Sequence, residues 1–169
     1  KNGLPSLLDN LDVGAALKLI HSTIDNYSAT AVAVDLGSLY RLSDKIRLAF
    51  AVQNLGTAMK FSQESDPLPA NIKIAAAYQP SKDLRLGAQL DQYLLDEKIV
   101  PALGVEYWIR DALALRGGYS FSYDTSTLGA AAGMSLGMGI KVSGLGFDYA
   151  FRPLGDLGAS HSLSFWVRF

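Results

Sequence analysis

The chain has 169 residues, of which 49% are hydrophobic, and its 15 basic and 16 acidic side chains give a formal net charge of −1. A nearly neutral chain lacks the basic footprint of a nucleic-acid-binding protein, and the absence of cysteine excludes disulfides and thiolate metal sites. Charged residues recur too often to leave the run of about 18 apolar residues that a membrane helix needs.

Alternation of apolar and polar residues with a period of two runs through most of the chain and predicts strands. Turn-forming stretches such as RLSDK, QPSKD and RPLGDLG separate the alternating segments. Residues 1–10 could hold a short helix or strand remnant as a lead-in outside the sheet, and 54–69 reads as the longest loop. The expected strands, about ten in number, lie at residues 11–21, 28–40, 45–53, 70–79, 83–91, 99–108, 112–122, 127–138, 143–151 and 158–169.

The two faces of these strands differ in chemistry. One face is apolar and is exemplified by Ile46, Leu48 and Phe50. The opposite face, named the polar face below, carries small residues and the charges Lys18, Asp35, Arg47, Lys73, Arg85, Asp91, Glu106, Arg116, Asp148 and Arg168. A soluble sandwich or lipocalin would turn the apolar face inward, whereas a transmembrane barrel would turn it toward lipid and line its lumen with the polar face.

Loop lengths and aromatic positions favour the barrel. Connections near 41–44, 80–82, 109–111 and 139–142 are short, and the alternate connections near 22–27, 54–69, 92–98, 122–126 and 152–157 are generally longer. Outer-membrane barrels have short periplasmic turns, longer outer loops and an aromatic girdle at each membrane interface. The expected girdle residues are Tyr27, Tyr40, Tyr78, Tyr107, Phe121, Tyr149 and Phe151. Leu39, Trp108 and Trp166 fit poorly, since they fall on the polar face.

The sequence therefore predicts an all-β fold, an antiparallel transmembrane β-barrel, with residues 1–169 forming a single domain. The expected charges of both signs are more typical of pairing across neighbouring strands in a filled lumen than of a selectivity ring of one sign.

Several stretches resemble a known family. "VDLGSLYRLSDKIRLAFAVQNLGTAMKF", "DPLPANIKIAAAYQP", "GVEYWIRDALALRGGYSF" and "GFDYAFRPLGDLGASHSLSFWVRF" resemble the C-terminal part of PorV/PorQ-type outer-membrane proteins, which are similar to FadL-type barrels. The resemblance implies a Gram-negative outer-membrane location and a larger barrel of about fourteen strands. It also implies that earlier strands precede this chain, so residues 11–21 are expected not to pair with 158–169. Phe165, Val167 and Phe169 look like the signal that the barrel-assembly machinery reads.

The resemblance implies two different functions. One is protein export, as a shuttle or attachment component of type IX secretion that binds other secretion components or exported cargo. The other is FadL-like transport of hydrophobic small molecules. A soluble β-protein that binds a ligand remains the alternative from another class. Outer-membrane lipid is the expected partner of the apolar face, and neither a cofactor nor nucleic acid is expected.

Catalytic and metal sites find little support in the sequence. His161 and Ser162 are adjacent, so on a strand they face opposite sides and cannot form a dyad. The other histidine of the chain is His21. Asp91, Asp96 and Glu97 lack the spacing of an EF-hand, and a solvated loop is the simpler interpretation. We therefore expect a protein that is not an enzyme and holds no metal.

Overall fold

The computed structural model describes residues 7–25, 27–61, 64–123, 129, 131–155 and 158–168. Its contacts divide the chain into two compact units, which are described separately below. Unit 1 contains residues 1–75 and 90–99, and unit 2 contains residues 76–89 and 100–169. The expectation of a single domain remains a prediction.

The fold is all-β, as the sequence predicts, and rests on ten long antiparallel strands. Their hydrogen-bonded order is β1-β2-β3-β6-β7-β8-β9-β10-β11-β12, so the order along the sheet follows the order along the chain. The strands are β1 (Leu11–Ile24), β2 (Tyr27–Arg41), β3 (Ile46–Gly56), β6 (Asn71–Tyr78), β7 (Leu84–Tyr93), β8 (Lys98–Ile109), β9 (Leu113–Ser120), β10 (Met134–Val142), β11 (Leu145–Pro153) and β12 (Ala159–Val167). A short 3₁₀ helix, η1 (Leu7–Asn10), precedes β1. Within the described part of the chain, no helix has the length and hydropathy needed to cross a membrane.

In unit 1, β1 and β2 form a long hairpin whose pairing runs from Leu11 opposite Tyr40 to Ile24 opposite Tyr27. The expected longer connection near 22–27 is therefore wrong. Both strands continue through it, and only residues 25 and 26 join them, with Asp25 at a φ of 52°. The polar residues in HSTIDNYS resembled a loop, but short polar side chains are tolerated on the exposed end of a hairpin.

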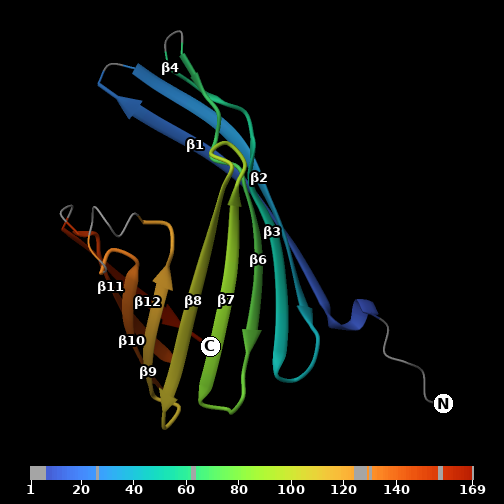
Figure 1. Ribbon diagram of the computed structural model, residues 1–169, viewed down its shortest axis with the longest axis vertical. Coiled ribbons are helices and arrows are strands. Elements are labelled where there is room, and N and C mark those ends of the chain that lie inside the picture. Colours follow the sequence, from blue (N-terminus) through green and yellow to red (C-terminus); the bar gives the residue numbers. More distant parts are fainter. Residues whose placement is uncertain are drawn as a thin grey trace. The chain divides into compact units, whose positions relative to one another are not determined.

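The segment between β3 and β6 is more structured than the expected loop. It contains the strands β4 (Met59–Phe61) and β5 (Glu64–Asp66), which form a two-stranded sheet of their own. Figure 1 shows β4 near β2. In the buried cluster of this unit, Leu68 packs with Ala31 and Ala33 of β2. Sequence reasoning missed this hairpin because three-residue strands are too short to show alternation.

In unit 2, tight turns join β8 to β9 and β10 to β11, and β9 to β12 lie side by side (Figure 1). Arg110 and Asp111 have φ values of 51° and 55° in the turn between β8 and β9, which matches the two positive φ values of a type I′ hairpin turn. Ser143 and Gly144 turn the chain between β10 and β11.

The expected strand at 127–138 is misplaced, since β10 begins at Met134 and continues to Val142. Glycine and alanine are frequent between 129 and 139, so the alternation that marks a strand is weak there. Part of the expected strand, residues 127, 128 and 130, lies outside the described residues.

The two faces of the strands differ in exposure as well as in chemistry. On β10 the apolar residues Met134, Leu136, Met138 and Ile140 are exposed, whereas Gly139 on the opposite face is buried. Among the described residues no large side chain is fully buried, and the buried apolar residues are mostly alanines. A soluble sandwich or lipocalin would bury its large apolar side chains in a core. The exposed apolar face therefore argues against the soluble alternative.

Candidate functional site

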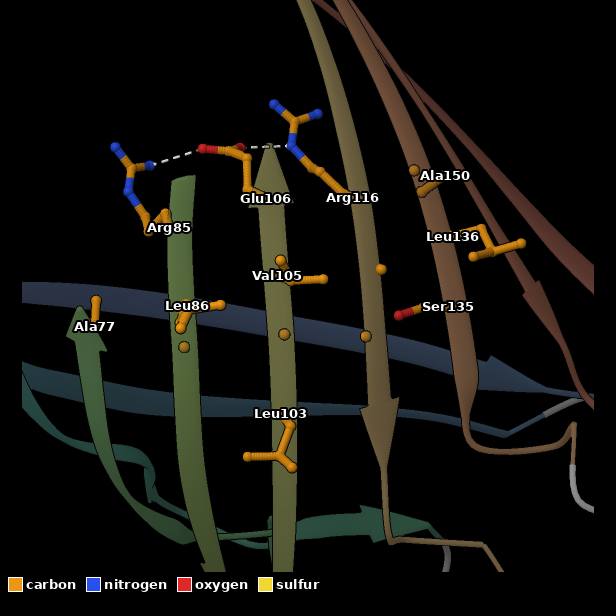
Figure 2. A pocket seen from close by; sticks show the side chains of 15 residues that line it. Ala77, Arg85, Leu86, Leu103, Val105, Glu106, Arg116, Ser135, Leu136 and Ala150 are labelled. Carbon is orange, nitrogen blue, oxygen red and sulfur yellow. Dashed lines mark hydrogen bonds and ion pairs between the residues drawn. The ribbon is translucent and has the colours of Figure 1, made fainter. Parts of the chain in front are cut away.

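Four charged side chains form a connected row on the polar face of unit 2. We call Arg85, Glu106, Arg116 and Asp148 the charge belt. Arg85 Nη1 lies 3.0 Å from Glu106 Oε1, Arg116 Nε lies 2.7 Å from Glu106 Oε2, and Arg116 Nη1 lies 2.5 Å from Asp148 Oδ1. Figure 2 shows Arg85, Glu106 and Arg116 on neighbouring strands, with dashed lines joining Glu106 to both arginines.

Strand register explains how the belt forms. Glu106 lies directly opposite Arg116 across β8 and β9. Arg116 and Asp148 come from β9 and β11, so their side chains meet across the intervening β10. Long side chains on one face of a sheet can bridge such diagonal separations. The belt therefore connects β7, β8, β9 and β11 through side chains.

Both tryptophans of the chain are attached to this belt. The indole N–H of Trp108 donates to Glu106 Oε1 at 2.9 Å, and the indole N–H of Trp166 donates to Asp148 Oδ2 at 2.9 Å. The Arg116 guanidinium carbon also lies 5.9 Å from the centre of the Trp108 ring. The position of both tryptophans on the polar face, a misfit in the sequence, follows from these contacts. Sequence reasoning missed their role, although they share the parity of the charges.

Glycines make room for the belt on the neighbouring strands. A Cβ atom added at Gly146 would collide with the Trp166 ring, and one added at Gly139 would collide with Asp148 and Arg116. A Cβ at Gly137 would lie 3.2 Å from Arg116 Cβ, which is tight. The glycines of β10 and β11 thus leave the space that the side chains of Arg116, Asp148 and Trp166 occupy.

A hollow of about 470 Å³ lies beside the belt in unit 2. Arg85, Glu106 and Arg116 border it, and the rest of its lining is small or apolar (Figure 2). The small lining residues are Ala77, Gly87, Gly104, Gly117, Gly118, Ser135, Gly137 and Ala150. Ligand pockets are commonly of about this size, at about 300–1,000 Å³, with a few polar groups beside an apolar surface.

Two further ion pairs, both in unit 1, join charges that the sequence places on the polar face. Lys18 Nζ lies 2.5 Å from Asp35 Oδ2 and donates to Asn54 Oδ1 at 2.9 Å, and the Asn54 backbone N–H donates to Asp35 at 2.8 Å. Lys73 pairs with Asp91 at 3.2 Å, and Asp91 is only 8% exposed. Each lysine thus pairs with a carboxylate from another strand, Lys18 of β1 with Asp35 of β2 and Lys73 of β6 with Asp91 of β7.

Eight of the ten charged residues expected on the polar face take part in ion pairs within one unit or the other. Among the described residues, Arg47 and Arg168 are the two that these ion pairs do not include. Arg47 lies opposite Arg41, which instead pairs with Asp12, a contact that sequence reasoning did not anticipate. That this face lines a lumen remains a prediction.

The residues expected on the lipid side occupy the apolar face in several strands. Of the expected girdle, Tyr27, Tyr78, Tyr107 and Phe121 are exposed. The remaining members, Tyr40, Tyr149 and Phe151, are half-buried. Phe165 and Val167 of the expected insertion signal are exposed on β12, and Phe169 lies outside the described residues. Their roles at the membrane remain predictions.

Each histidine bonds a hydroxyl on the neighbouring strand. His21 Nδ1 lies 2.9 Å from Thr30 Oγ1, and His161 Nδ1 lies 2.8 Å from the Tyr149 hydroxyl. The Phe151 ring centre lies 5.3 Å from that of His161.

The acidic residues considered for a metal site have other surroundings. Asp91 pairs with Lys73, while Asp96 and Glu97 lie in the turn between β7 and β8. Across the described residues, no three His, Asp or Glu side chains are grouped to hold a metal ion.

No family model matches this chain, and no curated protein matches it. Solved structures of similar fold do exist. A TodX monoaromatic hydrocarbon channel mutant, deltaS2S3, is 15% identical with a TM-score of 0.61, over 96% of this chain and 59% of that one. A mutant porin of Rh. blastica is 16% identical with a TM-score of 0.52, over 94% of this chain and 55% of the porin. This chain therefore spans little more than half the length of these structures. Its fold is that of the outer-membrane β-barrels.

Proposed function

We propose that this chain belongs to a non-enzymatic bacterial outer-membrane β-barrel that passes hydrophobic small molecules. The opposite chemistry of the two strand faces carries the proposal. Leu17, Leu163 and Phe165 are 78%, 69% and 67% exposed on the apolar face, while eight of the ten charges expected on the other face form ion pairs. Lipid would cover the first face, and a passage would lie along the second.

The length of the apolar rows is appropriate for a bilayer. On β1 the apolar face runs from Leu11 through Val13 and Leu17 to Leu19, before His21 interrupts it. At about 3.4 Å per residue and a strand tilt of about 40°, such a row rises about 20 Å across a membrane. Outer-membrane barrels have an apolar band about 25 Å tall.

The likeness to a monoaromatic hydrocarbon channel supports the choice of solute. The test is the uptake of radiolabelled toluene by Gram-negative cells that lack their own hydrocarbon channel, with and without the full-length protein. We expect faster uptake in cells that carry the protein in their outer membrane. Equal uptake at equal surface expression would contradict the proposal.

Export of proteins is the second candidate, and the sequence resemblance to PorV/PorQ-type proteins favours it. In this role the protein would bind exported cargo or other secretion-system components. Deleting the gene in the native host would then cause secreted proteins to accumulate in the periplasm, while toluene uptake would stay unchanged. Normal secretion in the deletion strain would argue against export.

We further propose that the barrel-assembly machinery inserts this protein by recognising Phe165, Val167 and Phe169. Replacing Phe169 by Asp at a membrane interface has a direct cost of only about 0–1 kcal/mol. A large loss of surface-located protein in Phe169→Asp would therefore indicate failed recognition during assembly. Wild-type levels of insertion would rule out this role for Phe169.

A further inference from the structure

The segment between β3 and β6 folds back over the polar face of the β1–β2 hairpin. We call residues 57–61 and 64–70 the strap; it contains β4 and β5. Ala31 and Ala33 of β2 are each 1% exposed, and Leu68 of the strap, 8% exposed, packs with them. Ile20 of β1 and Met59 of β4 complete this buried cluster.

The strap lies on the side of the sheet that carries the charges. Ala33 is two positions from Asp35 on β2, and Ile20 is two positions from Lys18 on β1. Residues two apart on a strand point to the same face. Because Lys18 and Asp35 form an ion pair, the buried cluster shares the polar face with them. The strap therefore covers the face along which the proposed passage would lie.

Hydrogen bonds hold the strap mainly at its two ends. The Thr57 backbone N–H donates to the Val32 carbonyl at 3.0 Å, and the Val32 N–H donates to Thr57 Oγ1 at 3.1 Å. At the other end, Asn54 Nδ2 donates to the Pro69 carbonyl at 3.0 Å. The Leu94 N–H donates to the Ala70 carbonyl at 3.0 Å. Near these ends, Met59 and Leu68 supply the strap's apolar contacts with the β1–β2 hairpin.

Two features suit a cover that can lift. Few buried apolar side chains attach the strap, and segments with few such contacts open locally at low free energy. Asn71, the first residue after the strap, is 6% exposed, and its side-chain carbonyl oxygen has no hydrogen-bond partner among the described residues. A buried acceptor without a partner is unfavourable, so a rearrangement that hydrates it would relieve that penalty.

We infer that the strap is a movable cover that narrows the passage at β1 and β2. Leu68 and Met59 hold it closed, and we call these two side chains the latch. The inference rests on the proposed function, because a cover has a role only if solutes pass along this face. It identifies a gate within this chain and the side chains that hold the gate closed.

The first experiment measures whether the strap covers the polar face of the β1–β2 hairpin. The chain has no cysteine, so single cysteines report their own surroundings. Ala31→Cys lies under the strap, whereas Ala16→Cys is exposed on the same face of β1 and serves as the matched control. We expect a water-soluble maleimide to label Ala16→Cys in the full-length, membrane-inserted protein at least about tenfold faster than Ala31→Cys. Equal labelling rates would overturn the inference.

A second variant tests the latch. Adding Leu68→Ala and Met59→Ala to Ala31→Cys should raise its labelling rate at least about tenfold, because these truncations remove most of the apolar contact under the strap. The Ala16→Cys rate should not change in the same background. Heat-modified migration on gels confirms that each variant is folded and inserted. Labelling of Ala31→Cys that is unaffected by the two truncations would refute the latch.

The third experiment locks the cover. Ala33→Cys and Leu68→Cys replace two residues that pack together, so oxidation can join them by a disulfide. In planar bilayers we expect lower ion conductance for the oxidised protein and recovery after reduction, with no change for either single variant. Ion conductance does not require the protein to accept hydrocarbons, so this readout separates failure of the gate from failure of the proposed solute. Equal conductance before and after reduction would overturn the gate.

Discussion

The indole N–H of Trp166 donates to Asp148 Oδ2 at 2.9 Å, which ties the polar face of β12 to the charge belt. Replacing Trp166 by Phe keeps an aromatic ring and removes the donor. A hydrogen bond to a charged group contributes about 1.5–3 kcal/mol, so we expect Trp166→Phe to lower the free energy of unfolding by about 2 kcal/mol. Urea titration of the protein in lipid vesicles measures this loss.

Ser162→Ala, on the same face of β12, is the control for this variant. A double-mutant cycle with Asp148→Asn should show coupling of at least about 0.5 kcal/mol between the two sites. If the two substitutions lower the free energy of unfolding additively, the contact between Trp166 and Asp148 does not contribute to stability.

Arg116 and Arg85 should differ sharply in their contributions to stability. Arg116 bonds both carboxylates of the belt, so Arg116→Met leaves Glu106 and Asp148 short of a cation. Removing one partner of a largely desolvated pair costs about 3–5 kcal/mol, and we expect about 3 kcal/mol here because Arg116 is part-exposed. Arg85 is 45% exposed and bonds Glu106 alone, so Arg85→Met should cost at most about 1 kcal/mol.

The same urea titrations rank these two variants. If both variants lower the free energy of unfolding by the same amount, Arg116 contributes no more to the charge belt than Arg85 does.

Glycine positions on the polar face should respond differently to the same substitution. Gly146→Ala places a methyl group against the Trp166 ring and should cost about 1–3 kcal/mol through overpacking. Gly87→Ala meets nothing within 4 Å. It should be neutral or stabilise the fold by about 0.4–1 kcal/mol, because alanine restricts the unfolded chain.

Thermal unfolding of both glycine variants in detergent provides the comparison. If Gly87→Ala lowers the stability more than Gly146→Ala does, the interpretation that Gly146 makes room for Trp166 is wrong.

Neighbouring residues of β12 separate the lipid-facing and polar faces. Leu163, 69% exposed, lies near the middle of β12, and Ser164 points to the opposite face. Leu163→Lys should lower the free energy of unfolding in vesicles by about 2–4 kcal/mol if lipid covers it. Ser164→Lys on the polar face should change it by less than about 1 kcal/mol.

In water an exposed leucine can be replaced by lysine with little effect. If both lysine variants change the free energy of unfolding by equally small amounts, lipid does not cover the apolar face.

The ten long strands could be predicted because alternation over eight or more residues is a strong signal. The error at β10 arose where the signal is weakest, in a segment where glycine and alanine replace large side chains. The β4–β5 hairpin was missed for a related reason. Its position depends on Leu68 meeting Ala31 and Ala33, a contact between distant segments that local periodicity does not encode.

The charged part of the site could be predicted by parity, but its connections could not. Parity placed Arg116 and Glu106 on one face, whereas their contact depends on strand register, which turns and bulges determine. The tryptophans were misjudged because a large aromatic residue on a polar face looks like an exception. Trp108 and Trp166 fit there only because an indole combines an apolar ring with one donor.

The order of strands in the sheet has a consequence for folding. Each long strand pairs with the next long strand along the chain, so most partners meet by closing loops of a few residues. Contacts between segments close in sequence form fast, because little loop entropy is lost. There are two exceptions, the step from β3 to β6, where 57–70 intervenes and β4 pairs with β5, and the step from β9 to β10, where 121–133 intervenes. Hairpins such as β8–β9 and β11–β12 should therefore form early, and joining β3 to β6 and β9 to β10 should be the slow steps that limit assembly of the sheet.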